Sequence, residues 1–105
     1  MTQDSLILRA RRVEYLSKLD EDLFFEWLNK LPCVLGVEGI GDELLITVAT
    51  NAVDDACLRE LLAIFFRYQI NMKQLAAFKD EQNRRWFSNA TAYWHSKVFT
   101  KNTAP

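Results

Sequence analysis

The stretch that decides the fold is AVDDACLRELLAIFFRYQINMKQLAAF, residues 52–78. Its hydrophobic residues recur at helical spacing and cover most of the helix circumference, which leaves few positions for a polar face. A helix of this kind is surrounded by protein, so we expect it to form the scaffold of the fold. The pattern restarts at Asn71, which is suited to cap a new helix, with Gln74 in the capping-box position. Two helices joined by a tight corner are therefore predicted.

The length and composition predict a single globular domain over residues 1–105. The chain is 50% hydrophobic and 12% aromatic, which argues against disorder. Its longest strictly apolar run, Leu61 to Phe66, is far too short to cross a bilayer. The N-terminus lacks the order of charged, apolar and small residues that a signal peptide has. We expect a soluble, cytoplasmic protein.

The remaining pattern predicts a mainly helical α+β domain with about five helices. A first helix is expected from Asp4 or Ser5 to Lys18. A second is expected from Asp20, as its cap, to the residue before Pro32. The inner side of the first helix is assigned Leu6, Ala10, Val13 and Leu16. The inner stripe of the second is assigned Leu23, Phe24, Trp27, Leu28 and Leu31.

Residues 33–49 predict a β-hairpin, because two β-rich runs flank the turn residues at 39–42. A two-stranded hairpin is marginal in water, and no third strand is evident elsewhere in the chain. A partner strand from another molecule, including a homo-oligomer through the hairpin edge, is one way to complete it. Asn51 or Asp54 is expected to cap the central helix. A C-terminal helical region is expected from about residue 80, with a possible break at Ser88-Asn89.

The charges are segregated along the sequence although the net charge is only −1. Residues 20–60 carry ten acidic and two basic side chains, a net of −8. Residues 1–19 have a net of +2 and residues 61–105 a net of +5. Such segregation creates surfaces of one sign and affects association more than fold.

The sequence contains no set of residues typical of catalysis, metal binding or cofactor binding. Cys33 and Cys57 do not form a CxxC motif and are expected to be reduced thiols. His95 is the only histidine, and no nearby carboxylate is predicted to orient it. The glycines at 36, 39 and 41 suit turns and lack the βαβ context of a dinucleotide site. We therefore expect a protein that is not an enzyme and has no cofactor.

Within residues 61–78, the segment from Tyr68 to Phe78 resembles the turn and recognition helix of helix-turn-helix DNA-binding domains. In that alternative, Lys73, Gln74 and Ala77 would face the major groove. Two residues depart from the pattern: Gln69 replaces the usual turn glycine and Phe65 replaces a small residue. An ordinary helical corner explains the same residues.

Five aromatic residues cluster near the C-terminus. Such clustering is found in cores and also at interface hot spots, and both interpretations remain open for this group. The members are Trp86, Phe87, Tyr93, Trp94 and Phe99.

In length, in the lack of a catalytic set and in its acid-rich segment, the chain resembles the immunity proteins of bacterial contact-dependent growth-inhibition systems. That resemblance implies an antitoxin that binds and neutralises a cognate toxin, very often a nuclease. A nuclease must be basic to hold phosphates, so acidic side chains would attract it and speed the encounter. Membrane partners are not expected, and nucleic-acid partners are disfavoured. The candidate partner-binding residues are Asp20, Glu21, Asp22, Glu26, Glu38, Asp42, Glu43, Asp54 and Asp55.

Overall fold

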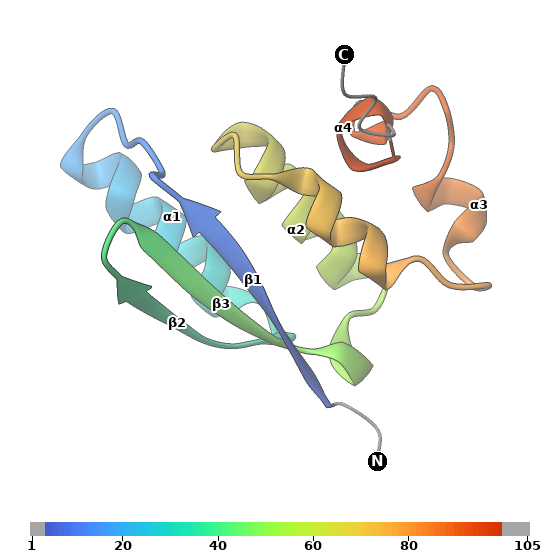
Figure 1. Ribbon diagram of the computed structural model, residues 1–105, viewed down its shortest axis with the longest axis horizontal. Coiled ribbons are helices and arrows are strands. Elements are labelled where there is room, and N and C mark those ends of the chain that lie inside the picture. Colours follow the sequence, from blue (N-terminus) through green and yellow to red (C-terminus); the bar gives the residue numbers. More distant parts are fainter. Residues whose placement is uncertain (1–3, 100–105) are drawn as a thin grey trace.

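A three-stranded antiparallel sheet forms one side of the molecule (Figure 1). Its strands are β1 (Ser5–Arg11), β2 (Val34–Ile40) and β3 (Glu43–Ala49), in the spatial order β1-β3-β2. This computed structural model describes residues 4–99 of the chain. Within that range the sheet and the helices described below confirm the predicted α+β class.

The hairpin predicted around residues 33–49 is confirmed as β2 and β3. Ile40 pairs with Glu43, so the connection consists of Gly41 and Asp42 alone. Gly41 has a φ of +61°, in the left-handed region that favours glycine, and glycine at the first turn position is typical of a type II′ hairpin. The twist of that turn matches the twist of the two strands.

The predicted first helix is wrong, because residues 5–11 form strand β1. Leu8 and Ala10 point into the core and lie opposite Ile46 and Leu44 of β3. Ile7, Arg9 and Arg11 are exposed, which is the period-two alternation of a half-buried strand. The missing third strand therefore comes from this chain. Strand β1 pairs with β3, so one edge of the predicted hairpin is covered by a strand of the same chain.

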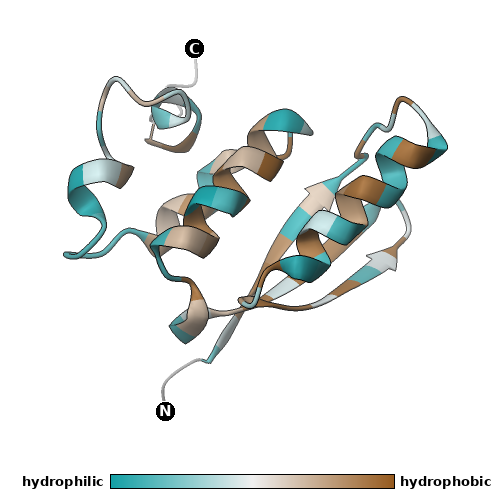
Figure 2. Cartoon of the chain, turned by 180° about the vertical axis from the view of Figure 1, so that it is seen from behind, coloured by the Kyte–Doolittle hydropathy of each residue, from teal (hydrophilic) through white to brown (hydrophobic). Residues whose placement is uncertain are grey.

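The second predicted helix is confirmed as α1 (Lys18–Lys30), although its cap differs from the expectation. The cap is Ser17, whose Oγ accepts a hydrogen bond from the backbone N–H of Asp20 at 3.1 Å. Phe24 and Leu28 of this helix are fully buried. Helix α1 lies behind the sheet in Figure 1 and in front of it in Figure 2, and α2 runs beside α1.

The central helix is confirmed as α2 (Asp55–Arg67). Asp54 is its cap and accepts the N–H of Cys57 at 2.9 Å. Six of its residues are buried, which makes it the most buried helix of the described chain and confirms its predicted role as scaffold. They are Cys57, Leu58, Leu61, Leu62, Ile64 and Phe65.

The predicted corner after α2 is also confirmed. The N–H of Ile70 donates to the carbonyl of Phe65 at 2.9 Å, which closes the helix in a Schellman motif. Asn71 then caps the 3₁₀ helix η2 (Met72–Phe78) by accepting the N–H of Lys73 at 3.0 Å. A shorter 3₁₀ helix, η1 (Thr50–Ala52), precedes α2.

The C-terminal region consists of α3 (Arg84–Phe87) and α4 (His95–Phe99), so the expected break after Ser88 is present. Both short helices lie beyond α2, on the side away from the sheet (Figure 1). Phe87 and Trp94 are buried, and Trp94 Nε1 donates to the carbonyl of Phe87 at 2.6 Å. Most of the C-terminal aromatic cluster therefore belongs to the core, whereas Tyr93 is half-exposed.

Candidate protein-binding surface

The nine candidate acidic residues lie on three separate parts of the fold. Four lie on α1, three on the β2–β3 hairpin and two at the start of α2. Asp42 immediately precedes β3, whereas Asp54 follows that strand only after the 3₁₀ helix at residues 50–52.

Two of the three hairpin acids, Asp42 and Glu43, are paired with arginines of β1 and of the residue that follows it. Arg9 Nη1 lies 3.1 Å from Glu43 Oε1, and Arg12 Nε lies 2.9 Å from Asp42 Oδ2. A third guanidinium, that of Arg11, lies 3.7 Å from the same Asp42 oxygen. The hydrogen bond from Arg12 holds the pKa of Asp42 below its ordinary value. The strand pairing of β1 thus offsets part of the charge that the sequence places in residues 20–60.

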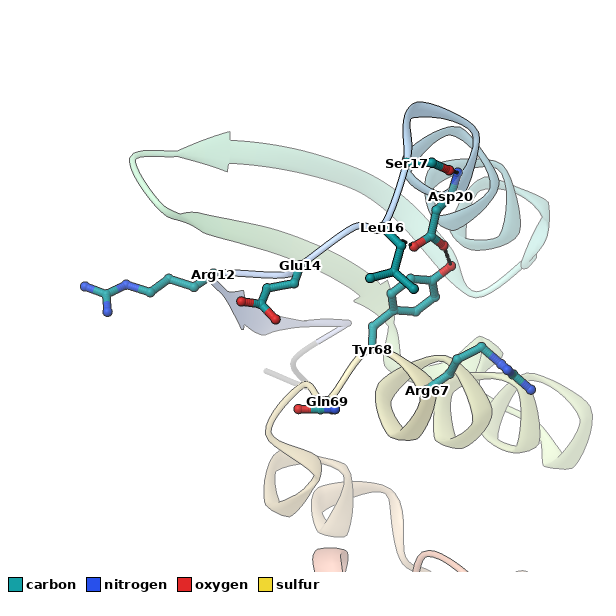
Figure 3. Close-up of a pocket in the computed structure, with 8 residues that line it drawn as sticks. All are labelled: Arg12, Glu14, Leu16, Ser17, Asp20, Arg67, Tyr68 and Gln69. Carbon is teal, nitrogen blue, oxygen red and sulfur yellow. Dashed lines mark hydrogen bonds between the residues drawn. The ribbon is translucent and has the colours of Figure 1, made fainter.

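Asp20 has a structural role. Its Oδ2 accepts the backbone N–H of Leu16, and its Oδ1 accepts the hydroxyl of Tyr68, both at 2.8 Å (Figure 3). These two hydrogen bonds, the one from Leu16 first, lower the pKa of Asp20. Because Tyr68 follows α2 directly, Asp20 joins the start of α1 to the end of α2. The side chain of Asp54 also has a structural role, because it caps α2 by accepting the N–H of Cys57.

The other acids of α1 remain on its exposed side. Lys18 lies 3.0 Å from Asp22 and 3.9 Å from Glu21, and Lys30 lies 3.2 Å from Glu26. Hydrogen bonding to Asp22 raises the pKa of Lys18. Exposed pairs of this kind contribute little to stability, so a partner can compete for these carboxylates.

Three leucines beside these acids are exposed. The exposed fractions are 94% for Leu16, 68% for Leu19 and 54% for Leu23. The sequence pattern predicts Leu16 and Leu23 on the inner sides of their helices, and both predictions are wrong. Leu19 and Leu23 are one turn apart and share a side of α1, along which hydrophobic and hydrophilic segments alternate in Figure 2. The α1 outer face is defined here as Leu16, Leu19, Leu23, Asp22 and Glu26.

An open cleft of about 820 Å³ adjoins this face (Figure 3). Arg12 and Gln69, which have φ values of 52° and 57°, both line it and are the two non-glycine residues with positive φ in the described chain. In Figure 3 the guanidinium groups of Arg12 and Arg67 point away from the Asp20–Tyr68 hydrogen bond. The remaining lining residues are Glu14, Leu16, Ser17, Asp20 and Tyr68.

The cleft does not contain the reactive groups that the sequence offers. His95 is absent from its lining and lies beside Phe99, with ring centroids 5.5 Å apart and planes tilted by 45°. Cys33 and Cys57 are buried free thiols elsewhere in the core. Burial and hydrogen bonding to Cys57 raise the pKa of Cys33 to about 12. Between residues 4 and 99, no three His, Cys, Asp or Glu side chains are grouped to hold a metal ion.

The corner that resembles a helix-turn-helix motif is engaged with the sheet. Gln74 accepts the N–H of Arg9 through Oε1 and donates to the carbonyl of Arg9 through Nε2, both at 2.8 Å. A second acceptor for Nε2 is the carbonyl of Asn71 at 2.7 Å. Gln74 is therefore turned toward β1, and the segment is a 3₁₀ helix of seven residues. This geometry gives DNA recognition through Gln74 no support.

In comparisons with known proteins, no family model matches the sequence, and no curated protein or solved structure shows significant similarity to the chain. Among the helices of residues 4–99, none has the length and apolar character needed to cross a bilayer.

The sequence identified the acids of the α1 outer face but not its leucines. Helical periodicity assigns Leu23 and Phe24 to the same stripe, and only the packing of α1 on the sheet decides that Phe24 points inward. The predicted inner stripe of the second helix does not include Leu19, and Leu19 is exposed in the structure.

Proposed function

We propose that the chain is a cytoplasmic immunity-type inhibitor that binds a basic toxin domain, of the nuclease kind, through the α1 outer face. The observation that carries the proposal is the exposure of Leu16, Leu19 and Leu23 next to acidic side chains. Isolated exposed leucines are common on protein surfaces, but apolar anchors with a charged rim have the composition of a protein interface.

The leucines would supply the binding energy. Burying an exposed leucine side chain is worth about 1.5–3 kcal/mol before the costs of association are subtracted. Leu19 and Leu23 lie on a helix, so docking would cost little backbone entropy. Contacts of this kind chiefly slow dissociation.

The acids would supply speed and selectivity. Helix α1 carries four carboxylates and two lysines, a net of −2, and its acids are exposed or half-buried. A negative helix attracts a positively charged partner from a distance, and this effect weakens as salt is added. Glu38 and Asp55 are exposed and have no ion pair within residues 4–99, so they extend the negative field beyond α1.

The test begins with purification of the tagged chain from its native cells and identification of what is bound. The proposal requires a basic protein domain whose nuclease activity the chain inhibits at a one-to-one ratio. Leu19→Ser should weaken binding by about tenfold. The matched control is Leu35→Ser on β2, because Leu35 is 62% exposed and is not part of the α1 outer face.

Charge reversal provides a second readout. Asp22→Lys with Glu26→Lys should slow association at low salt by about tenfold and leave the dissociation rate nearly unchanged. Asp20 is excluded from this test, because its side chain joins α1 to Tyr68. Equal loss of binding in Leu19→Ser and Leu35→Ser, or an acidic partner, would contradict the proposal.

A further inference from the structure

We infer that a second surface, at the C-terminal end of α2, binds an acidic peptide segment that carries an apolar side chain. This inference goes beyond the proposed function and uses none of the residues of the α1 outer face. The surface is called the α2–α4 groove and is defined by Phe66, Arg67, Lys73, Tyr93 and Lys97.

The groove consists of two adjoining hollows of about 530 and 550 Å³, which share Phe66 and Gln69. The first is bordered by Ala63 and Tyr93, and the second has buried apolar residues, Ile70 and Met72 among them, in its lining. An apolar side chain of a peptide therefore finds an apolar floor here.

The charge of the groove has a single sign. Its lining includes Arg67, Lys73 and Lys97 and no carboxylate. In the described part of the chain, the ion pairs are made by arginines at 9, 11 and 12 and by lysines at 18 and 30. The three cations of the groove therefore have no ion pair there. Glu60 acts electrostatically on Tyr93 but lies outside the lining of both hollows, and it accepts the indole N–H of Trp27 at 2.8 Å. Carboxylates of a ligand would complement these cations.

The aromatic rings favour a peptide over single-stranded nucleic acid. Phe66 and Tyr93 are 40% and 50% exposed and meet edge to face, with centroids 4.9 Å apart and planes at 83°. Tyr93 also meets Trp94 edge to face at 4.8 Å, and Lys97 Nζ lies 5.9 Å from the Phe66 centroid. Rings that stand at such steep angles to one another do not form the flat platform on which successive bases stack. The exposed parts of both rings remain available to an aliphatic or aromatic side chain.

Residues 100–105 are a poor occupant on grounds of charge. They contain Lys101 and no acidic side chain. A separate chain with carboxylates on both sides of an apolar residue fits the groove better, because it pairs with the cations and fills the hollow in one segment.

The experiment is a titration of the ¹⁵N-labelled chain with synthetic peptides, followed by backbone amide shifts. The probe is a glutamate-rich peptide with one central phenylalanine. Its controls are the same peptide with serine at the centre, the same peptide with lysines for glutamates, and oligothymidylate. The phenylalanine probe should shift the amides of Phe66, Tyr93 and Lys97, and each control peptide should bind at least about fivefold more weakly.

Two variants locate the site. Lys97→Glu should weaken the probe by about fivefold or more, whereas Arg85→Glu changes the same charge on exposed α3 outside the groove and should have little effect. The inference is overturned by absence of shifts at millimolar probe, by shifts centred on α1, by stronger binding of oligothymidylate, or by equal effects of the two variants. Circular dichroism of each variant verifies that it is folded.

Discussion

At the scale of single residues, Gln69 occupies the backbone conformation that glycine usually takes after a helix. Its φ is 57°, and its N–H donates to the carbonyl of Phe66 at 3.3 Å within the Schellman motif. A left-handed conformation costs a residue with a Cβ about 1–2 kcal/mol. The corner exists here without glycine because the hydrogen bond from Ile70 to Phe65 and the Asn71 cap hold it from both sides.

We therefore predict that Gln69→Gly raises the free energy of unfolding by about 0.5–1 kcal/mol. Removal of the left-handed penalty outweighs the greater chain entropy of glycine in the unfolded state. Urea denaturation measures the change. Gln69→Ala keeps the Cβ and should give no gain, so equal stabilisation by both variants would contradict the explanation.

The two thiols give a second residue-scale prediction. Cys33 is fully buried and has a pKa raised to about 12, chiefly by burial, and Cys57 is nearly buried. Both should resist a thiol reagent at neutral pH and react only when the chain unfolds, since the thiolate is the reactive form. The labelling rate should rise in step with the unfolded fraction in urea. A fast-reacting thiol in the native protein would show that the core opens locally.

At the scale of elements, Gln74 acts as the outer neighbour of strand β1. Its side-chain amide bonds both the N–H and the carbonyl of Arg9, as a residue of a further strand would. Edge strands expose backbone groups that invite pairing with other chains. Helix η2 thus blocks the middle of the β1 edge, whereas the outer edge of β2 has no neighbouring strand in the sheet of residues 4–99.

We predict that Gln74→Ala lowers the free energy of unfolding by about 1–2 kcal/mol, because three hydrogen bonds are lost and water replaces only part of them. Amide hydrogen exchange at Arg9 should quicken by about tenfold. Gln82→Ala is the control, because Gln82 is exposed and its side chain makes no hydrogen bond within residues 4–99. Unchanged exchange at Arg9 would contradict the role of Gln74.

At the scale of the whole molecule, two carboxylates join parts of the chain that are distant in sequence. Asp20 joins α1 to the residue after α2, and Asp42 joins the hairpin turn to the end of β1. The charge segregation of the sequence is thereby partly neutralised at the sheet, while α1 stays acidic and the α2–α4 groove stays basic.

These two groups predict how stability responds to acid. Both have a folded-state pKa below the ordinary value of 3.8, so their contribution is complete above that value. As pH falls below about 4 the unfolded state binds more protons, and the contribution is lost as pH passes through the folded pKa values. Between pH 6 and pH 2, the urea midpoint of the parent should fall as the pH is lowered. In the double variant Asp20→Asn with Asp42→Asn, this fall should be less steep. Glu38→Gln is the control, because Glu38 is exposed and has no ion pair within residues 4–99. A parental slope in the double variant would contradict this assignment.

The sequence by itself determined α1, α2, the hairpin and the corner at Asn71. Each depends on local features: a hydrophobic period of 3.6 or 2, turn glycines, and caps within three residues of the groups they bond. The same local reasoning located acids for the candidate surface, including Asp22 and Glu26. These features act within a few residues, so the rest of the chain does not override them.

Only the tertiary structure decided the state of residues 5–11 and the content of the two surfaces. The segment SLILRAR suits a helix or a strand, and pairing with β3, more than thirty residues away, selects the strand. The same packing points Phe24 inward, leaves Leu19 and Leu23 outside, and brings Lys97 to Phe66. Contacts between distant segments decide these features, because local propensities leave them nearly equal in energy.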